Sequence, residues 1–203
     1  MTLLDAVGPA EVLSRLPGVS VSFIGRRRGV VRGDTGHGAV IADLRIDDVD
    51  RLDVLLVPGG SGAGGTAVVS HEPTMRWIRH IDATSTWTTS VCTGSLILAY
   101  AGLLQGLRAT TYWSAKDVLT AKGAIYVPGR WVRSGKYVTA AGVSAGIDMG
   151  LFLASLLADE VTAQACQLAL EYDPEPPFDT GSPDKAGPEL QRLALRLLEQ
   201  SQR

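Results

Sequence analysis

Residues 86–104 read TWTTSVCTGSLILAYAGLL, and they join a strand-like segment directly to a helix-like one. The first part, 86–91, is rich in Thr, Trp and Val, which are typical of strands. The second part, 94–104, has the composition of a buried helix. Cys92 and Thr93 therefore lie at the junction. The stretch predicts a strand, a sharp turn and a helix, with a cysteine on the turn.

The rest of the chain alternates between the two kinds of segment in the same way. An apolar run at 52–57 ends at Pro58-Gly59-Gly60, which indicates a strand buried on both faces and stopped by a turn. Alternating strands and helices predict an α/β fold with a mostly parallel sheet and helices on both faces. Further strands are expected at 19–25, 39–46, 86–91, 109–113, within 124–133 and at 137–141. Further helices are expected at 7–16, 72–83, 115–122, 144–158, 160–172 and 189–202, after an irregular Pro- and Gly-rich stretch at 173–188.

Composition narrows the class of protein. The chain has 203 residues, of which 45% are hydrophobic and 20% charged, and we expect one globular domain spanning 1–203. Its formal net charge of −2 provides no excess of cations for a phosphate backbone, so nucleic acid is not an expected partner. No basic segment precedes an apolar stretch at the start, and no apolar window reaches membrane-spanning length, so a membrane is not expected either. Two cysteines fit a reducing cytoplasm.

Cys92 is a candidate nucleophile. A thiol at a helix N-terminus feels the helix dipole, which favours thiolate and predicts a depressed pKa. The alternative is that Cys92 is an inert buried residue, as free cysteines usually are, and position alone does not separate the two. Cys166 lies inside a helical pattern and is expected to serve packing.

A second motif competes for the role of nucleophile. Residues 142–146 read GVSAG, which matches the G-x-S-x-G elbow of α/β-hydrolases. Those hydrolases place the histidine after the serine, whereas His37, His71 and His80 all precede Ser144. We therefore expect Ser144 to cap the helix that follows.

The glycine-rich run at 60–65 contains G-x-G-x-x-G after a strand, the pattern of dinucleotide binding. No clear helix is expected before Pro73, so the context is poor. The alternative is that the N–H groups of Gly59 and Gly60 face developing negative charge in a reaction. The scattered histidines and cysteines have no metal-ligand spacing, and no metal is expected.

Asp5 lies in an apolar stretch, LLDAVGP, at residues 3–9. Burial would raise its pKa and make it a candidate proton donor or acceptor. A role as the N-cap of the following helix is an equally good interpretation.

Together these residues resemble the ThiJ/PfpI superfamily, and within it the bacterial isocyanide hydratases. The resemblance implies a flavodoxin-like α/β sandwich with a cysteine nucleophile elbow, a homodimer and no cofactor. The resemblance is carried by LLDAVGPAEVL (3–13), VLLVPGG (54–60), SVCTGSLILAYAGLLQGLRATTYW (90–113), TAAGVSAGID (139–148) and LEYDPEPPFDTGSPDKA (170–186).

The same resemblance implies roles for individual residues. Cys92 matches the nucleophile, Asp5 its acidic partner, Thr93 the residue that offers an N–H and a hydroxyl, and Gly60 part of the backbone pocket. The implied reaction is hydration of an isocyanide to an N-substituted formamide through a thioimidate on Cys92. Alternatives within the superfamily are a glyoxalase or deglycase that uses the same thiol, and a redox sensor whose thiolate oxidises.

Two positions depart from the pattern that the resemblance implies. The superfamily's first strand normally precedes the segment around Asp5, whereas this chain starts four residues before it, as expected for a misassigned start. Similar proteins often have histidine after the Ala-Thr-Thr run, and this chain has Tyr112. The superfamily's peptidase-like members carry histidine directly after the nucleophile, so Thr93 disfavours proteolysis.

Overall fold

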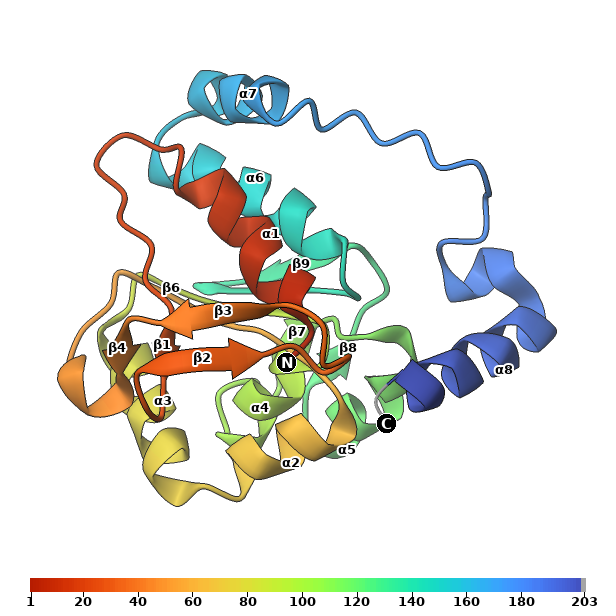
Figure 1. The fold of residues 1–203 in the computed structure, drawn as a ribbon, viewed down its shortest axis with the longest axis horizontal. Helices are drawn as coiled ribbons and strands as arrows, with labels where there is room; N and C mark the ends of the chain where they lie inside the picture. The colour runs from red at the N-terminus through yellow and green to blue at the C-terminus, as the bar shows by residue number, and fades with distance from the viewer. Residues whose placement is uncertain (202–203) are drawn as a thin grey trace.

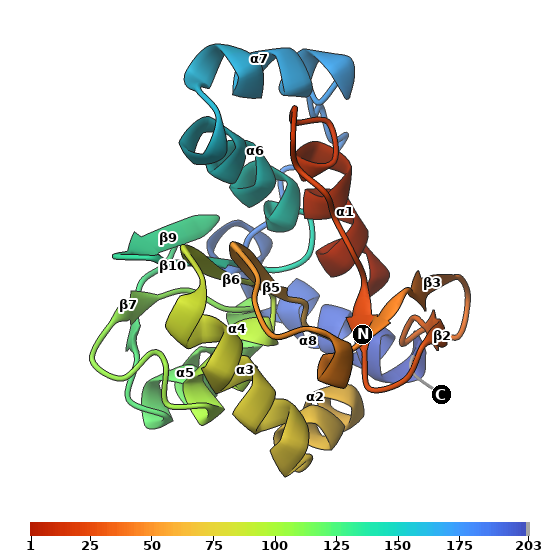
Figure 2. The same cartoon turned by 90° about the vertical axis from the view of Figure 1, so that its left-hand side faces the viewer.

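A computed structural model describes residues 1–201 (Figure 1), and its central sheet has four strands in the order β5-β6-β10-β9 (Figure 2). Strands β5 (Val54–Val57), β6 (Trp87–Val91) and β10 (Tyr137–Ala140) are parallel, and β9 (Trp131–Ser134) is antiparallel to β10. The sheet is mostly parallel, so the α/β prediction is confirmed. Its parallel strands bring the carboxyl ends of β5, β6 and β10 to one edge, which is where such sheets bind ligands.

Helices cover both faces of this sheet, as Figure 2 shows. One core forms between the sheet and α1, α6 and α7, and a second core forms between the sheet and α3, α4 and α5. The helices are α1 (Leu3–Leu13), α2 (Gly62–Val69), α3 (Glu72–Thr84), α4 (Gly94–Tyr100), α5 (Lys116–Ala121), α6 (Ala145–Leu157), α7 (Glu160–Ala169) and α8 (Pro183–Ser201), with short 3-10 turns at Ile46–Asp48 and Trp113–Ala115.

Three pairs of short strands lie outside the central sheet. β2 and β3 form an antiparallel hairpin, whereas β1 pairs with β4 and β7 with β8 in parallel. Their bounds are β1 (Ile24–Gly25), β2 (Gly29–Arg32), β3 (Ala39–Ala42), β4 (Leu44–Arg45), β7 (Arg108–Ala109) and β8 (Ile125–Tyr126).

Two predicted strands are shorter than the sequence indicates. Only residues 24–25 of the predicted strand 19–25 pair with another strand, and residues 20–22 are exposed, so their alternating pattern finds no sheet to bury it. The predicted strand 109–113 ends at Ala109 because the N–H of Thr110 donates to the side-chain hydroxyl of Thr139 instead of a backbone carbonyl of a neighbouring strand.

Several helix bounds also differ from prediction. α1 begins at Leu3 rather than residue 7, and α4 ends at Tyr100 rather than 104, just before Gly102 at φ 82°. α8 begins at Pro183, inside the stretch predicted to be irregular, and kinks at Gly187, whose φ is 68°. The chain between α7 and α8 is extended (Figure 1), and the predicted end of the last helix, residue 202, lies outside the described residues.

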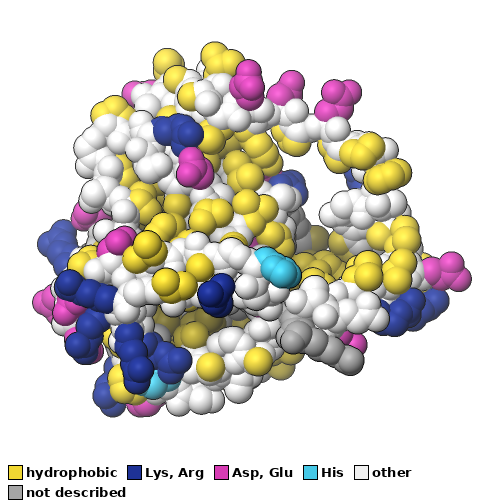
Figure 3. All heavy atoms as spheres, in the orientation of Figure 1, with side chains coloured by type: hydrophobic (Ala, Val, Ile, Leu, Met, Phe, Trp, Pro, Cys, Tyr) yellow, Lys and Arg dark blue, Asp and Glu magenta, His cyan; other side chains and the backbone are white. Residues whose placement is uncertain are grey.

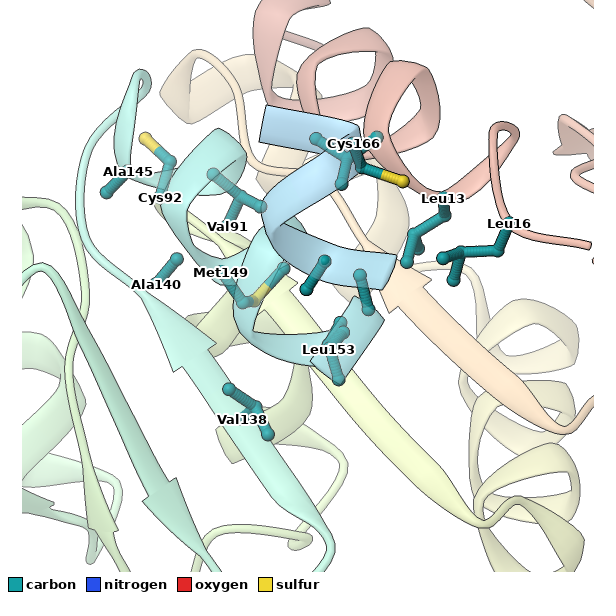
Figure 4. Packing of buried hydrophobic residues seen from close by; sticks show 13 residues of the cluster. Leu13, Leu16, Val91, Cys92, Val138, Ala140, Ala145, Met149, Leu153 and Cys166 are labelled. Atoms are coloured by element: carbon teal, nitrogen blue, oxygen red, sulfur yellow. The ribbon is translucent and has the colours of Figure 1, made fainter. Parts of the chain in front are cut away.

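The core on the α1 and α6 side contains both cysteines. Cys166 of α7 is 5% exposed and packs among apolar side chains that include Leu13 and Leu153 (Figure 4). The prediction that Cys166 serves packing is therefore confirmed.

Within residues 1–201, no helix combines the length and the hydropathy that crossing a membrane requires.

Candidate active site

Cys92 occupies a strained turn between β6 and α4. Its φ of 59° lies in the left-handed region, which a residue with a side chain enters only when its surroundings fix it there. The Cys92 N–H donates to the carbonyls of Ala140 and Ala141, and its carbonyl accepts from the hydroxyls of Ser95 and Thr111. The predicted strand–turn–helix junction is confirmed, and hydrogen bonds to both the N–H and the carbonyl of Cys92 fix its backbone.

The turn depends on a glycine directly after Thr93. A Cβ on Gly94 would lie 2.0 Å from the carbonyl oxygen of Val57 at the end of β5. Only glycine lets the start of α4 approach the neighbouring strand this closely. The close approach brings the carboxyl ends of β5 and β6, and hence Gly59 and Cys92, together.

Asp5 lies beside Cys92 and is 0% exposed. Its Oδ2 accepts the N–H of Gly59 at 3.0 Å, whereas its Oδ1 is buried and accepts no N–H or O–H from the described residues. Burial raises the pKa of Asp5 to about 7, more than the hydrogen bonds from Gly59 and the Cys92 thiol lower it. Asp5 is inside α1, whose N-cap is Thr2, so the N-cap interpretation is wrong.

The thiol does not have the depressed pKa that the sequence predicts. Burial raises the pKa of Cys92 most, and the negative charge of Asp5 raises it further, while contacts with the Thr93 N–H and hydroxyl lower it less. The helix N-terminus is a local effect, and desolvation of a thiol that is 5% exposed outweighs it. Cys92 therefore stays protonated in the resting site and needs a base, which Asp5 can supply near neutral pH.

Thr93, Gly59 and Gly60 lie together against Cys92, but the N–H groups of the two glycines do not make the predicted contacts. The Gly60 N–H donates to the Thr93 hydroxyl at 3.0 Å, and that hydroxyl is within 3.0 Å of the Gly60 carbonyl. The Gly59 N–H donates to Asp5. Both glycine N–H groups therefore already have acceptors, and neither is free to bind a negatively charged reaction intermediate, contrary to prediction. The two glycines instead position Asp5 and Thr93.

A cleft of about 1820 Å³ leads to this group, and Gly59, Gly60 and Thr93 line part of its wall. Cys92 and Asp5 lie behind that wall, nearly or fully buried. Hydrophobic side chains show in the hollow beneath the β2–β3 hairpin (Figure 3). The cleft lining also includes charged side chains, among them Arg26, Arg27 and Arg51, but the sulfur itself lies in buried surroundings, which favour a small, neutral substrate over a charged one.

Sequence reasoning missed Asp34, which comes from the β2–β3 hairpin. Its Oδ2 accepts from the Thr2 hydroxyl at 2.8 Å and from the Ser61 N–H at 3.2 Å, and its charge adds to the raised pKa of Asp5. An exposed-looking aspartate in a Gly-rich loop carries no local signal of this placement. Only the fold brings Asp34 to the start of α1.

The competing motifs have other uses. Ser144 stands at the N-cap position of α6, but its side chain makes no cap and accepts from Arg130 at 3.2 Å, so the predicted capping role is wrong. A helix, α2, does begin in the glycine-rich run, contrary to prediction, and Gly59 and Gly60 before it pack closely against Thr93 and Met1.

The three histidines lie away from Cys92. His71 pairs with Thr74 at the start of α3, His80 lies 2.8 Å from an Asp50 oxygen, and His37 is exposed on the β2–β3 hairpin. In residues 1–201, no three side chains of His, Cys, Asp or Glu gather as metal ligands would.

The two cysteines should differ in reactivity. With a small alkylating reagent such as iodoacetamide near pH 8, we expect Cys92 to be labelled before Cys166, because Cys92 has Asp5 as a base and adjoins the cleft. Peptide mass spectrometry after a brief reaction measures both sites. Earlier labelling of Cys166 would contradict the site.

A mostly parallel sheet with helices on both faces and a cysteine on a strained strand–helix turn defines the class of α/β proteins with a cysteine elbow. Comparisons with known proteins identify the family within this class. The DJ-1/PfpI family model matches residues 1–156, so the chain belongs to the DJ-1/PfpI family of enzymes. The resemblance to the ThiJ/PfpI superfamily is confirmed.

Individual relatives agree with this assignment. The chain is 47% identical to the "Isonitrile hydratase" of Pseudomonas putida over 90% of its own length and 79% of that protein. It is 30% identical to "Deglycase PfpI" of Pyrococcus furiosus over 53% of its own length and 68% of that protein. A ThiJ/PfpI family protein from Pseudomonas syringae superposes with a TM-score of 0.92 at 36% identity, covering 100% of this chain and 83% of that one. The flavodoxin-like sandwich is confirmed.

Proposed function

We propose that the protein hydrates isocyanides, R–N≡C, to N-substituted formamides, R–NH–CHO. The observation that carries this proposal is the buried pair of Cys92 and Asp5, in which the Asp5 pKa of about 7 lets the carboxyl group take up and release a proton. The 47% identity to an isonitrile hydratase supports it.

The chemistry of an isocyanide suits this pair. Its terminal carbon must gain a nucleophile and then a proton, so a thiol and a proton carrier are needed side by side. The substrate is neutral and weakly solvated, and it enters an apolar site without the desolvation penalty of a charged ligand. Oδ1 of Asp5 is free of N–H and O–H donors among the described residues and is the atom that can carry the proton.

The reaction begins when Cys92 sulfur bonds to the terminal carbon and its proton passes to the Asp5 carboxylate. Asp5 then returns this proton to the same carbon, which gives the thioimidate Cys92–S–CH=N–R. Water adds across the C=N bond, with oxygen on carbon and hydrogen on nitrogen. The C–S bond breaks, the proton of the new hydroxyl passes to sulfur, and the formamide leaves with the thiol restored.

Thr93, Gly59 and Gly60 hold the pair in place during these steps. The Gly59 N–H fixes the Asp5 carboxyl, and the Thr93 N–H and hydroxyl lie against the sulfur, where they lower the thiol pKa and stabilise the developing thiolate. Gly60 fixes the Thr93 side chain through two contacts of 3.0 Å.

Similarity to the deglycase of Pyrococcus furiosus favours a second candidate, the conversion of small dicarbonyls by the same thiol. One assay separates the two. The purified protein is given an aryl or alkyl isocyanide and, separately, methylglyoxal, and formamide and lactate are followed. We expect formamide without lactate, whereas lactate without formamide would make the protein a dicarbonyl enzyme.

We also propose that the protein acts as a cytoplasmic homodimer. Large apolar side chains remain exposed on α7 and α8, among them Val161 at 76%, Leu168 at 77% and Leu197 at 55%, and a second copy would cover such surface. Sedimentation should give about twice the mass of the chain. A monomer at all concentrations would contradict this proposal.

A further inference from the structure

Cys92 lies between two neighbouring strand ends, and each brings one side chain toward it. On the β5 side, Gly59 holds Asp5. On the β10 side, the Cys92 N–H bonds to the Ala141 carbonyl and the Cys92 carbonyl bonds to the Thr111 hydroxyl. The next residues in the chain after these two partners are Gly142 and Tyr112. The topology therefore places Tyr112 on the side of Cys92 away from Gly59.

The ring of Tyr112 is seated on Gly142. A Cβ at Gly142 would lie 2.4 Å from Cδ2 and 2.8 Å from Cε2 of the Tyr112 ring, so only glycine leaves room for it. The ring of Trp113 packs on the Tyr112 ring, with 5.7 Å between the ring centroids and 48° between the ring planes. The first glycine of the G-x-S-x-G pattern, Gly142, is therefore explained by the packing of the Tyr112 ring and not by a catalytic serine.

The hydroxyl of Tyr112 is free to donate. The neighbouring Trp113 indole has an N–H donor and no acceptor, so it cannot take up the proton of the Tyr112 hydroxyl. The Tyr112 ring packs against the buried cluster that contains Cys92, which places this side chain beside the site. Burial raises the pKa of Tyr112, and the charge of a Cys92 thiolate raises it further. Tyr112 therefore stays a neutral donor across the range in which Asp5 titrates.

We propose that the Tyr112 hydroxyl donates a hydrogen bond to the substrate nitrogen while the substrate is bound to Cys92, and that this contact drives hydrolysis of the thioimidate. The inference rests on the proposed function. It assigns the two ends of the bound C=N group to two side chains: the carbon to Asp5 and the nitrogen to Tyr112.

The step itself needs a donor at nitrogen. When the water oxygen bonds to carbon, the electron pair of the C=N π bond moves onto nitrogen, which takes the water proton. A hydrogen bond from Tyr112 stabilises the negative charge that develops there before the proton arrives. Thioimidate formation places charge on carbon and does not use this contact, so loss of the hydroxyl should slow only the second half of the reaction.

The test is Tyr112→Phe, which keeps the ring on Gly142 and removes the donor. We expect steady-state formamide production to fall about 10²-fold, as when one oxyanion donor is removed. We expect intact-protein mass spectrometry to show Cys92 carrying the added mass of the isocyanide, because the thioimidate forms and then persists. Tyr100→Phe is the matched control, since that ring is 43% exposed over Lys122 on α4, and it should turn over as the wild type does.

A second variant tests the seat of the ring. Gly142→Ala pushes the Tyr112 ring away and should also accumulate the adduct, although its hydroxyl remains. Unchanged turnover of Tyr112→Phe, or slow turnover without adduct, overturns the role of Tyr112 while leaving isocyanide hydration intact. Absence of both formamide and adduct in wild type and variant overturns the proposed function and this inference with it.

Discussion

Asp5→Asn is expected to lower turnover of an isocyanide by about 10²- to 10⁴-fold, the usual contribution of a positioned general acid–base group. Asparagine keeps the shape of the side chain and can still accept the Gly59 N–H. It cannot take the thiol proton or return it to carbon. Substituting His37, His71 or His80 singly by Ala should change turnover little, because their contacts are with other parts of the chain.

The same substitution should stabilise the fold at high pH. The pKa of Asp5 rises from 3.8 to about 7 on folding, so the folded state holds this proton more tightly than the unfolded state. The stability that the protonated carboxyl provides is complete below pH 3.8 and is lost as pH rises through about 7. At about 1.4 kcal/mol per pKa unit, ionised Asp5 costs the fold about 4 kcal/mol above pH 7.

Denaturant unfolding at several pH values measures this effect. Asp5→Asn should gain up to about 4 kcal/mol above pH 7, and the gain should shrink as pH falls toward about 4. Asp82→Asn is the control, because Asp82 is a buried carboxylate paired with Lys136 and Thr88, and its loss should destabilise the protein. An Asp5→Asn protein that is fully active, or no more stable above pH 7 than wild type, would remove the proton carrier from the site.

Gly94→Ala should destabilise the protein by about 3 kcal/mol or more and abolish turnover in whatever protein remains folded. The added Cβ would meet the Val57 carbonyl oxygen at 2.0 Å, and backbone on both sides of this contact cannot move without displacing Cys92.

Gly62→Ala provides the matched control for Gly94→Ala. Gly62 is at the start of α2, and a Cβ added there would have no other atom within 4 Å, so alanine should be neutral or stabilise by up to about 1 kcal/mol. Urea midpoints of the two variants test the pair. Equal stability of both would mean that β5 and α4 do not approach as the structure has them.

The elbow could be predicted because its signals are local. A β-branched run, a cysteine and small residues at a helix start follow one another directly in the chain, and the structure places them as expected. The apolar neighbours of Asp5 make it a candidate proton carrier. The strand end that Asp5 contacts depends on the packing of α1, which the local sequence does not determine.

The wrong predictions have tertiary causes. The thiol pKa depends on burial and on a carboxyl group in α1, which is far away in the chain. The prediction from the local helix terminus, a lowered pKa, was therefore opposite to the raised pKa of the folded site. The N–H groups of Gly59 and Gly60 are bonded to Asp5 and Thr93, partners that no spacing near residue 60 reveals. The strand predicted at 19–25 has the right alternation but pairs only at its end.

The measurement that tests the central claim most directly is formamide production from one isocyanide by the wild type, Cys92→Ser and Cys166→Ser, at equal concentrations of folded protein. We expect the wild type and Cys166→Ser to form formamide at the same rate, and Cys92→Ser to form it no faster than buffer alone, because a hydroxyl cannot replace the thiol that forms and later releases the bond to carbon. Turnover by Cys92→Ser at the wild-type rate would contradict the account.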